Sequence, residues 1–345
     1  MDDALYGKRD KRGDWKPNKP NAYPPVFVWP AQPIAFAKWL FGYPGYILPW
    51  NLLYGVVAVL MWTYLTPGME TMRHLTPGWI AFLLARNTAA VFLFYGAFHL
   101  RLYMRKRQGT SFKFNGRWPS TDNSAFLFGN QTLDNVIWTF ACGVPVWTAY
   151  EVLTLWAFAN DYIPYVSFAE HPVYFLALFF LIPVWRDLHF YLVHRLIHSH
   201  FLYHAVHKLH HNNVNPGPWS GLAMHPVEHL LYFSVGLVHW LVPSHPIHAI
   251  FNLAHAALAP APGHAGFERV VLGDGRSVDL HCYEHYLHHK FFECNYADGV
   301  IPVDKWFGTF HDGSKEAEER MNARFMERAA KQRAKREAKA AHRAA

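Results

Sequence analysis

Residues 171–198 read HPVYFLALFFLIPVWRDLHFYLVHRLIH, and two features of this stretch decide how the chain folds. Its first part, to about Val193, is apolar over the roughly 20 residues that cross a hydrocarbon core of about 30 Å as an α-helix. Its last part places His194 and His198 one helical turn apart, so both imidazoles share one face. The stretch therefore predicts a membrane-spanning helix that ends in a pair of candidate metal ligands.

Three further apolar segments precede this one, at residues 46–65, 79–100 and 136–158. The composition agrees with a membrane protein, because 52% of the residues are hydrophobic and only 17% are charged. Arg86 interrupts the second segment. Since an arginine at the centre of a membrane helix costs about 2.5 to 3.5 kcal/mol, we expect Arg86 near an interface or beside a polar neighbour. The sequence predicts an all-α integral membrane protein with about four transmembrane helices forming a stem.

The basic residues indicate which side of the membrane each loop faces. They gather in residues 8–19 and 101–117, whereas the other two loops carry only Arg73. By the positive-inside rule, the N-terminus and the middle loop are cytoplasmic, and four crossings return the chain to the cytoplasm after about residue 193. Residues 230–242 and 247–259 are apolar but too short to span, so we expect a shallow or re-entrant hairpin resting in the bilayer.

The expected organisation has four parts: a polar, basic cytosolic segment (1–45), a transmembrane region of two helical hairpins (46–193), a catalytic cap (194–312) that includes the hairpin 230–259, and a basic tail (313–345). The tail is rich in strong helix formers. It is expected to be a solvated helix or disordered, or alternatively to bind anionic lipid headgroups. The three cysteines form no Cys-x-x-Cys pair, so neither a disulfide framework nor a thiolate zinc site is indicated.

Histidines carry the chemistry of the predicted cap. On a helix, positions i, i+3 and i+4 share one face with Cβ atoms about 5 to 6 Å apart, so a cluster directs two or three imidazoles at a common point. At this histidine frequency, chance would give roughly 0.1 copies of His-x-x-His-His, whereas the chain has two. The clusters, which together predict a site for two metals, are His194-x-x-x-His198, His207-x-x-His210-His211, His225-x-x-x-His229 and His285-x-x-His288-His289.

The residue types leave the metal and the function class partly open. Imidazole suits zinc, copper, iron and nickel. Activating dioxygen requires a metal that changes oxidation state, which zinc does not do, so an oxidative function favours iron. A membrane metal transporter or metal-binding protein is the alternative, although a transport path predicts ionisable ligands within the spans. The formal charge of +7 comes without any nucleic-acid-binding motif, so nucleic acid is not an expected partner.

The same residues resemble the membrane fatty acid hydroxylase and sterol desaturase superfamily, the histidine-box integral-membrane di-iron oxygenases. The likeness rests on the runs 187–198, 202–211, 225–228, 263–267, 285–289, 295–296 and 304–309. It implies two iron ions in a cytosolic helical cap, with zinc possible in a purified sample. Asp187 would orient a ligand histidine, or alternatively balance the charge of Arg186. The implied metal ligands are His194, His198, His207, His210, His211, His225, His264, His285, His288 and His289.

The resemblance also implies an activity: O2-dependent hydroxylation or desaturation of an unactivated C–H position in a lipid, either sterol-like or fatty acyl. The chain has neither a His-Pro-Gly-Gly haem signature nor a Gly-x-Gly-x-x-Gly motif. We therefore expect an external electron donor, a ferredoxin or cytochrome b-type protein with its reductase. The expected location is the bacterial inner membrane or the endoplasmic reticulum, with the active site on the cytoplasmic side. The lipid and the oligomeric state stay open.

Overall fold

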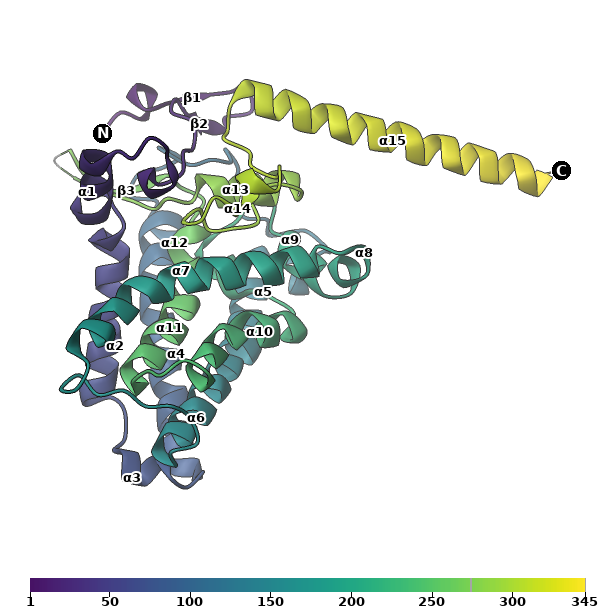
Figure 1. Cartoon of the computed structure of the whole chain (residues 1–345). Coiled ribbons are helices and arrows are strands. Elements are labelled where there is room, and N and C mark those ends of the chain that lie inside the picture. The colour runs from purple at the N-terminus through teal and green to yellow at the C-terminus, as the bar shows by residue number, and fades with distance from the viewer. Residues whose placement is uncertain (274, 345) are drawn as a thin grey trace.

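Four long helical spans form the stem of the computed structural model, which describes residues 1–273 and 275–344 (Figure 1). The spans are Ile47–Tyr64, Pro77–Met104, Gln131–Ala159 and Pro172–Ile197, and all are long and apolar enough to cross a membrane. They contain η3 (Ile47–Asn51), α2 (Leu52–Tyr64), α4 (Pro77–Phe98), η4 (His99–Met104), α5 (Gln131–Trp138), η6 (Thr139–Gly143), α6 (Val144–Ala159) and α7 (Pro172–Ile197). The predicted class, an all-α integral membrane fold with four candidate spans, is confirmed.

The two ends of the stem differ. The far end carries α3 (Met69–Met72) and the loop between α6 and α7, which meet where the Asn160 side chain donates to the Arg73 carbonyl at 3.1 Å. The cap covers the opposite end (Figure 1). Its elements are α8 (His200–Leu202), η7 (Tyr203–His207), α9 (Lys208–His211), η8 (Pro218–Leu222), α12 (Pro260–Gly263), α13 (Tyr283–Phe291), α14 (Val303–Trp306) and the antiparallel pair β3 (Arg269–Gly273) and β4 (Arg276–Asp279).

The hairpin, which was expected to be shallow or re-entrant, enters the stem. It consists of α10 (Pro226–Phe233), η9 (Ser234–Trp240) and α11 (Pro246–Leu258), and all 13 residues of α11 are buried in the protein. Helix α11 runs along α2, because His245 contacts Trp62 at one end and His255 contacts Tyr54 at the other. At its tip, Ser244 pairs through its backbone with the α6–α7 loop. Packing among the stem helices removes the apolar side chains of this hairpin from water, although each of its helices is too short to span the membrane alone.

Arg86 finds the polar neighbours that its position predicts. Its guanidinium forms an ion pair with Glu151 of α6, and both side chains are almost completely buried, at 3% and 1% exposure. The same carboxylate accepts a hydrogen bond of 2.9 Å from Asn87, and Thr66 accepts one of 3.1 Å from Arg86. A charge inside the stem is thus paired and hydrogen-bonded, the condition under which a membrane protein tolerates one.

The N-terminal segment packs on the cap. It contains η1 (Asp3–Leu5), the antiparallel hairpin β1 (Gly7–Arg9) and β2 (Trp15–Pro17), η2 (Pro25–Phe27) and α1 (Pro33–Phe41). Trp15 is 2% exposed, and its backbone N–H donates to Phe114 in the middle loop at 3.0 Å. That loop, which includes η5 (Leu127–Gly129), packs Phe114 onto Tyr286 of α13 with ring centroids 4.9 Å apart. The N-terminus therefore braces the helix that carries three of the predicted ligands.

The tail forms the helix α15 (Lys315–Ala344), which projects away from the body of the molecule (Figure 1). Its first half contacts the rest of the protein. Ala317 and Met321 are buried, Glu318 bonds to both Lys16 and Lys290, and Arg328 forms an ion pair with Glu293.

Candidate metal centre

Nine of the ten histidines predicted as metal ligands come together in the cap, in two adjoining groups. Within each group the candidate ligand atoms all lie within 4.8 Å of one another. Eight of the nine rings are buried, and His198 is partly exposed. The five-histidine group contains His194, His198, His207, His211 and His288, and the four-histidine group contains His210, His264, His285 and His289.

The two copies of His-x-x-His-His each contribute to both groups. Neighbouring positions on an α-helix point about 100° apart, because one turn takes about 3.6 residues. On α9, His211 joins the five-histidine group while His210 joins the other, and on α13 His288 and His289 divide in the same way. The rings of His211 and His289 lie 5.0 Å apart across the boundary. The two groups therefore share their supporting helices and lie side by side.

The distances inside each group suit a bound metal ion. The Nε2 atom of His264 lies 2.9 Å from that of His285 and 3.1 Å from that of His289. In the other group, the Nε2 atom of His211 lies 3.0 Å from that of His288 and 3.1 Å from that of His198. Two imidazoles bound to one metal at about 2.1 Å and a right angle would place their nitrogens about 3 Å apart.

The opposite ring nitrogens of five of these histidines are fixed by hydrogen bonds. A carbonyl oxygen only accepts, so each Nδ1 that meets one must carry the proton and leave Nε2 with its lone pair. The Nε2 of His207 is buried with no partner in the protein. Lone pairs that face each other at about 3 Å call for a cation between them. The five Nδ1 contacts are His194 to Tyr296 O, His207 to Glu228 Oε1, His210 to Ala223 O, His264 to Pro260 O and His288 to Cys294 O.

Burial keeps these imidazoles neutral. Desolvation, reinforced by the neighbouring rings, lowers the pKa of His210 and of His264 to about 3. The same causes hold the pKa of His207, His211 and His288 well below the ordinary value. Because a metal binds the neutral form of histidine, the site is in the protonation state that binding needs at neutral pH.

A loop after α13 positions His194. Its key residue is Tyr296, whose carbonyl oxygen accepts from His194 Nδ1 at 2.8 Å. Asn295 adopts a positive φ of 51°, a conformation that asparagine tolerates better than most residues. The carboxylate of Asp304 accepts from the backbone N–H groups of Tyr296 and Ala297 at 3.0 and 2.8 Å. Asp304, which follows the loop in sequence, therefore fixes the backbone of Tyr296 that contacts His194.

Asp187 does not contact a ligand histidine, which corrects its expected role. Its two carboxylate oxygens accept from the backbone N–H groups of Asp298 and Ile301 at 2.7 and 2.6 Å. The neighbouring Arg186 forms an ion pair with the side chain of Asp298. Asp187 thus ties α7 to the loop that carries Tyr296, and it acts on His194 only through that loop.

Glu228 contacts a candidate ligand histidine. Its Oε1 lies 2.8 Å from His207 Nδ1, and both side chains are buried, at 3% and 1% exposure. A carboxylate in this place orients the ring and increases its basicity toward a metal.

We predict that Glu228→Leu lowers the metal affinity of the five-histidine group by about 10- to 100-fold, the range typical of such supporting partners. Glu228→Gln should lose less, because its amide oxygen still accepts from His207 Nδ1. Competition with a chelator of known affinity measures both. The exposed Glu316→Leu on α15 is the control. Equal affinity in Glu228→Leu and the control would contradict the assignment.

His225 is the predicted ligand that lies outside both groups. It precedes α10, and its Nδ1 accepts from the backbone N–H of Val227 at 3.2 Å, so it caps that helix. His229, which was not expected to be a ligand, is buried against the Leu222 carbonyl and the thiol of Cys142. Neither ring joins the nine.

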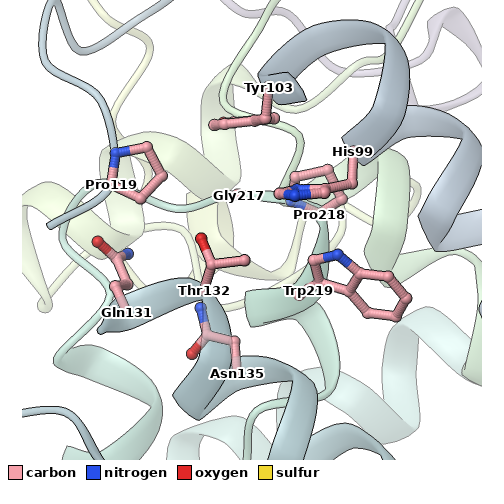
Figure 2. Close-up of a pocket in the computed structure, with 9 residues that line it drawn as sticks. All are labelled: His99, Tyr103, Pro119, Gln131, Thr132, Asn135, Gly217, Pro218 and Trp219. Atoms are coloured by element: carbon pink, nitrogen blue, oxygen red, sulfur yellow. The ribbon is translucent and has the colours of Figure 1, made fainter. Parts of the chain in front are cut away.

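Two hollows lie near the centre, and neither is lined by the nine histidines. A cavity of about 10 Å³ is lined by the residues in Figure 2: His99, Tyr103, Pro119, Gln131, Thr132, Asn135, Gly217, Pro218 and Trp219. It holds about one water molecule, and the buried Asn135 Oδ1 there has no protein partner. A cleft of about 450 Å³ is lined by residues 124–127, 134, 138, 204–206, 208, 209, 212 and 225. Its lining includes the neighbours of His207 but not His207 itself.

Four membrane helices under a buried nine-histidine cap define the class of this chain, an integral membrane protein with a clustered-histidine centre. Comparison with known proteins is consistent with this class. Residues 177–309, from α7 to the end of the Tyr296 loop, match the family described as fatty acid hydroxylase. This match agrees with the resemblance to the fatty acid hydroxylase and sterol desaturase superfamily that the motifs indicated.

Curated relatives share the same part of the chain. A Delta(7)-sterol 5(6)-desaturase of Gibberella zeae is 30% identical over 142 residues, which cover 36% of this chain and 39% of the relative. One from Aspergillus fumigatus is 29% identical over 144 residues, covering 36% and 45%. A putative methylsterol monooxygenase of Dictyostelium discoideum is 27% identical over 154 residues, covering 43% and 52%. The chain thus matches about half or less of each relative's length. No solved structure gives a significant match.

Proposed function

We propose that this chain is an O2-dependent di-iron oxygenase that hydroxylates or desaturates an unactivated C–H position of a membrane lipid. The observation that carries the proposal is the pair of adjoining histidine groups at one end of a membrane stem. The names of the relatives, sterol desaturases and a methylsterol monooxygenase, favour a sterol-like substrate over a fatty acyl one.

The nine clustered histidines are the proposed ligands, five for one ion and four for the other. Iron bound there would supply the change of oxidation state that dioxygen chemistry needs and that zinc lacks. Five of the nine rings are held with Nε2 toward the centre by their Nδ1 contacts, and eight of the nine are buried. Whether an alcohol or an alkene forms depends on where the lipid carbon sits, because a shift of about 1 Å changes reactivity strongly.

The proposed electron donor is external, a ferredoxin or cytochrome b-type protein with its reductase, since residues 1–345 contain neither a His-Pro-Gly-Gly haem signature nor a Gly-x-Gly-x-x-Gly motif. The proposed orientation places the cap in the cytoplasm, on the side of the basic N-terminus and middle loop.

The test is to reconstitute the iron-loaded chain in lipid discs with a donor chain and ¹⁸O₂, and to analyse sterols and acyl lipids by mass. A lipid that gains one labelled oxygen supports hydroxylation, and an O2-dependent loss of two hydrogens supports desaturation. If a fully loaded protein gives no O2-dependent product from any host lipid, the enzyme proposal fails.

A metal transporter is the second candidate. Of the nine histidines, only His194 falls within a span, at the last turn of α7. A transport path would need ligands deeper in the stem. Metal flux into sealed liposomes, dependent on His194, would favour transport over oxidation.

A further inference from the structure

The segment between η2 and the first span is apolar and exposed, although the N-terminal 45 residues were expected to be polar and cytosolic. Residues 24–43 carry a single charge, Lys38. Their large side chains nevertheless face outward: Trp29 is 89% exposed, Ile34 73% and Phe41 66%. Trp306 and Phe307 at the end of α14 are 62% and 67% exposed. We call residues 26–43 together with Trp306 and Phe307 the collar.

Contacts place the collar where the cap joins the stem. Phe27 meets Trp306 with ring centroids 6.2 Å apart, and Phe307 stacks on Tyr191 of α7 at 5.9 Å. At the other end of the collar, Trp39 packs on Tyr46, with ring centroids 4.9 Å apart. The collar therefore touches one membrane-spanning helix, α7, and runs directly into another, α2.

The position of α1 continues the lipid-facing surface of the stem. Only residues 42–46 separate α1 from the first span, whose Leu52, Val56, Val59 and Leu60 are themselves exposed. Figure 1 shows α1 beside the cap end of α2. With nine residues, α1 is about 14 Å long and too short to cross a bilayer.

The residue types of the collar indicate which partner covers it. A contiguous apolar patch of this kind is rarely left in water. Tryptophan, tyrosine and phenylalanine are the residues that favour the boundary between headgroups and acyl chains. An in-plane segment there buries its apolar side chains about 5 to 10 Å deep. We propose that the collar lies in the lipid interface, contacts acyl chains rather than water, and holds the cap down on the bilayer.

The proposal is tested with single cysteines labelled by a fluorescent bimane in a Cys142→Ala background, since the other native cysteines, Cys282 and Cys294, are buried. Trp29→Cys and Phe307→Cys probe the collar. Val59→Cys on α2 marks the lipid-facing surface, and the exposed Glu319→Cys on α15 marks water. Each protein is placed in lipid discs and quenched by brominated phosphatidylcholine or by aqueous iodide.

We expect brominated lipid to quench positions 29 and 307 several-fold more than position 319, and iodide to quench them several-fold less. Quenching at both positions like that at 319 would overturn the proposal. Protection from both quenchers, with cross-linking between copies at position 29, would also overturn it and show a second copy as the occupant.

A charge inserted in the collar gives an independent measurement. Trp29→Glu combined with Ile34→Glu should raise iodide quenching at position 307 about two-fold or more, because the collar leaves the lipid. Gln32→Glu adds a charge at an exposed polar position of the same segment and is the matched control. No difference between the two variants would contradict lipid anchoring. None of these readouts depends on catalytic activity, so the proposal stands or fails separately from the proposed function.

Discussion

His288→Ala should remove the metal from the five-histidine group and abolish turnover. His288 is fully buried, its Nδ1 donates to the Cys294 carbonyl at 2.7 Å, and its Nε2 faces that of His211 at 3.0 Å. Removing a ligand should cost more than removing a supporting partner, which typically lowers metal affinity or activity about 10- to 100-fold. We therefore expect a loss of activity above about 100-fold, measured as product per chain, and a metal content reduced by about one ion, measured by mass spectrometry.

Two companion variants separate ligand loss from general damage. His204→Ala removes an exposed ring one turn before His207 and should keep both metals. His225→Ala should lose only a helix cap, worth about 1 kcal/mol of stability, and should also keep both metals. Full metal occupancy and activity in His288→Ala would refute the ligand assignment, and metal loss in His225→Ala would restore His225 to the ligand set.

Arg86→Leu should destabilise the stem by about 3 to 5 kcal/mol, because it leaves the buried carboxylate of Glu151 without its counter-charge. Asn87 alone would still donate to that carboxylate, at 2.9 Å. Reversible unfolding in mixed detergent micelles, followed by circular dichroism, gives the free energy of unfolding.

The double variant Arg86→Leu, Glu151→Leu should recover a large part of the loss, because no unpaired charge remains. Arg73→Leu is the matched control: its pair with Glu70 is exposed, at 50% and 87%, and should contribute about 0 to 1 kcal/mol. Equal effects of Arg86→Leu and Arg73→Leu would show that the buried pair does not support the stem.

The sequence predicts the four spans because span length and hydropathy are local properties. It leaves the depth of the hairpin 230–259 open for the same reason. Whether a 13-residue apolar helix rests in lipid or packs inside the stem depends on contacts such as that between His255 and Tyr54, far apart along the chain. The apolar character of the collar could be read in part from the sequence, because residues 24–43 carry a single charge. The basic residues that precede them nevertheless suggested that the whole N-terminal segment is polar.

In the candidate metal centre, helical spacing and family motifs suffice to bring nine histidines together, since the side chains at i, i+3 and i+4 must share a face. The groups that fix these rings were less predictable. Four of the five partners of Nδ1 are backbone carbonyls, including those of Tyr296 and Cys294, and a carbonyl leaves no signature in the residue types. The resemblance implied that Asp187 orients a histidine or balances Arg186, whereas both of its carboxylate oxygens accept from backbone N–H groups of the loop.

The depth of α11 changes how the topology of this chain should be counted. Hydropathy finds four passes, but the tip of the hairpin at Ser244 reaches the loop between α6 and α7 at the far end of the stem. Going there and back adds two passes without changing which side the C-terminus occupies. A reporter fused at residue 244 would therefore map to the face opposite the cap, and such data would suggest six crossings where length and hydropathy indicate four.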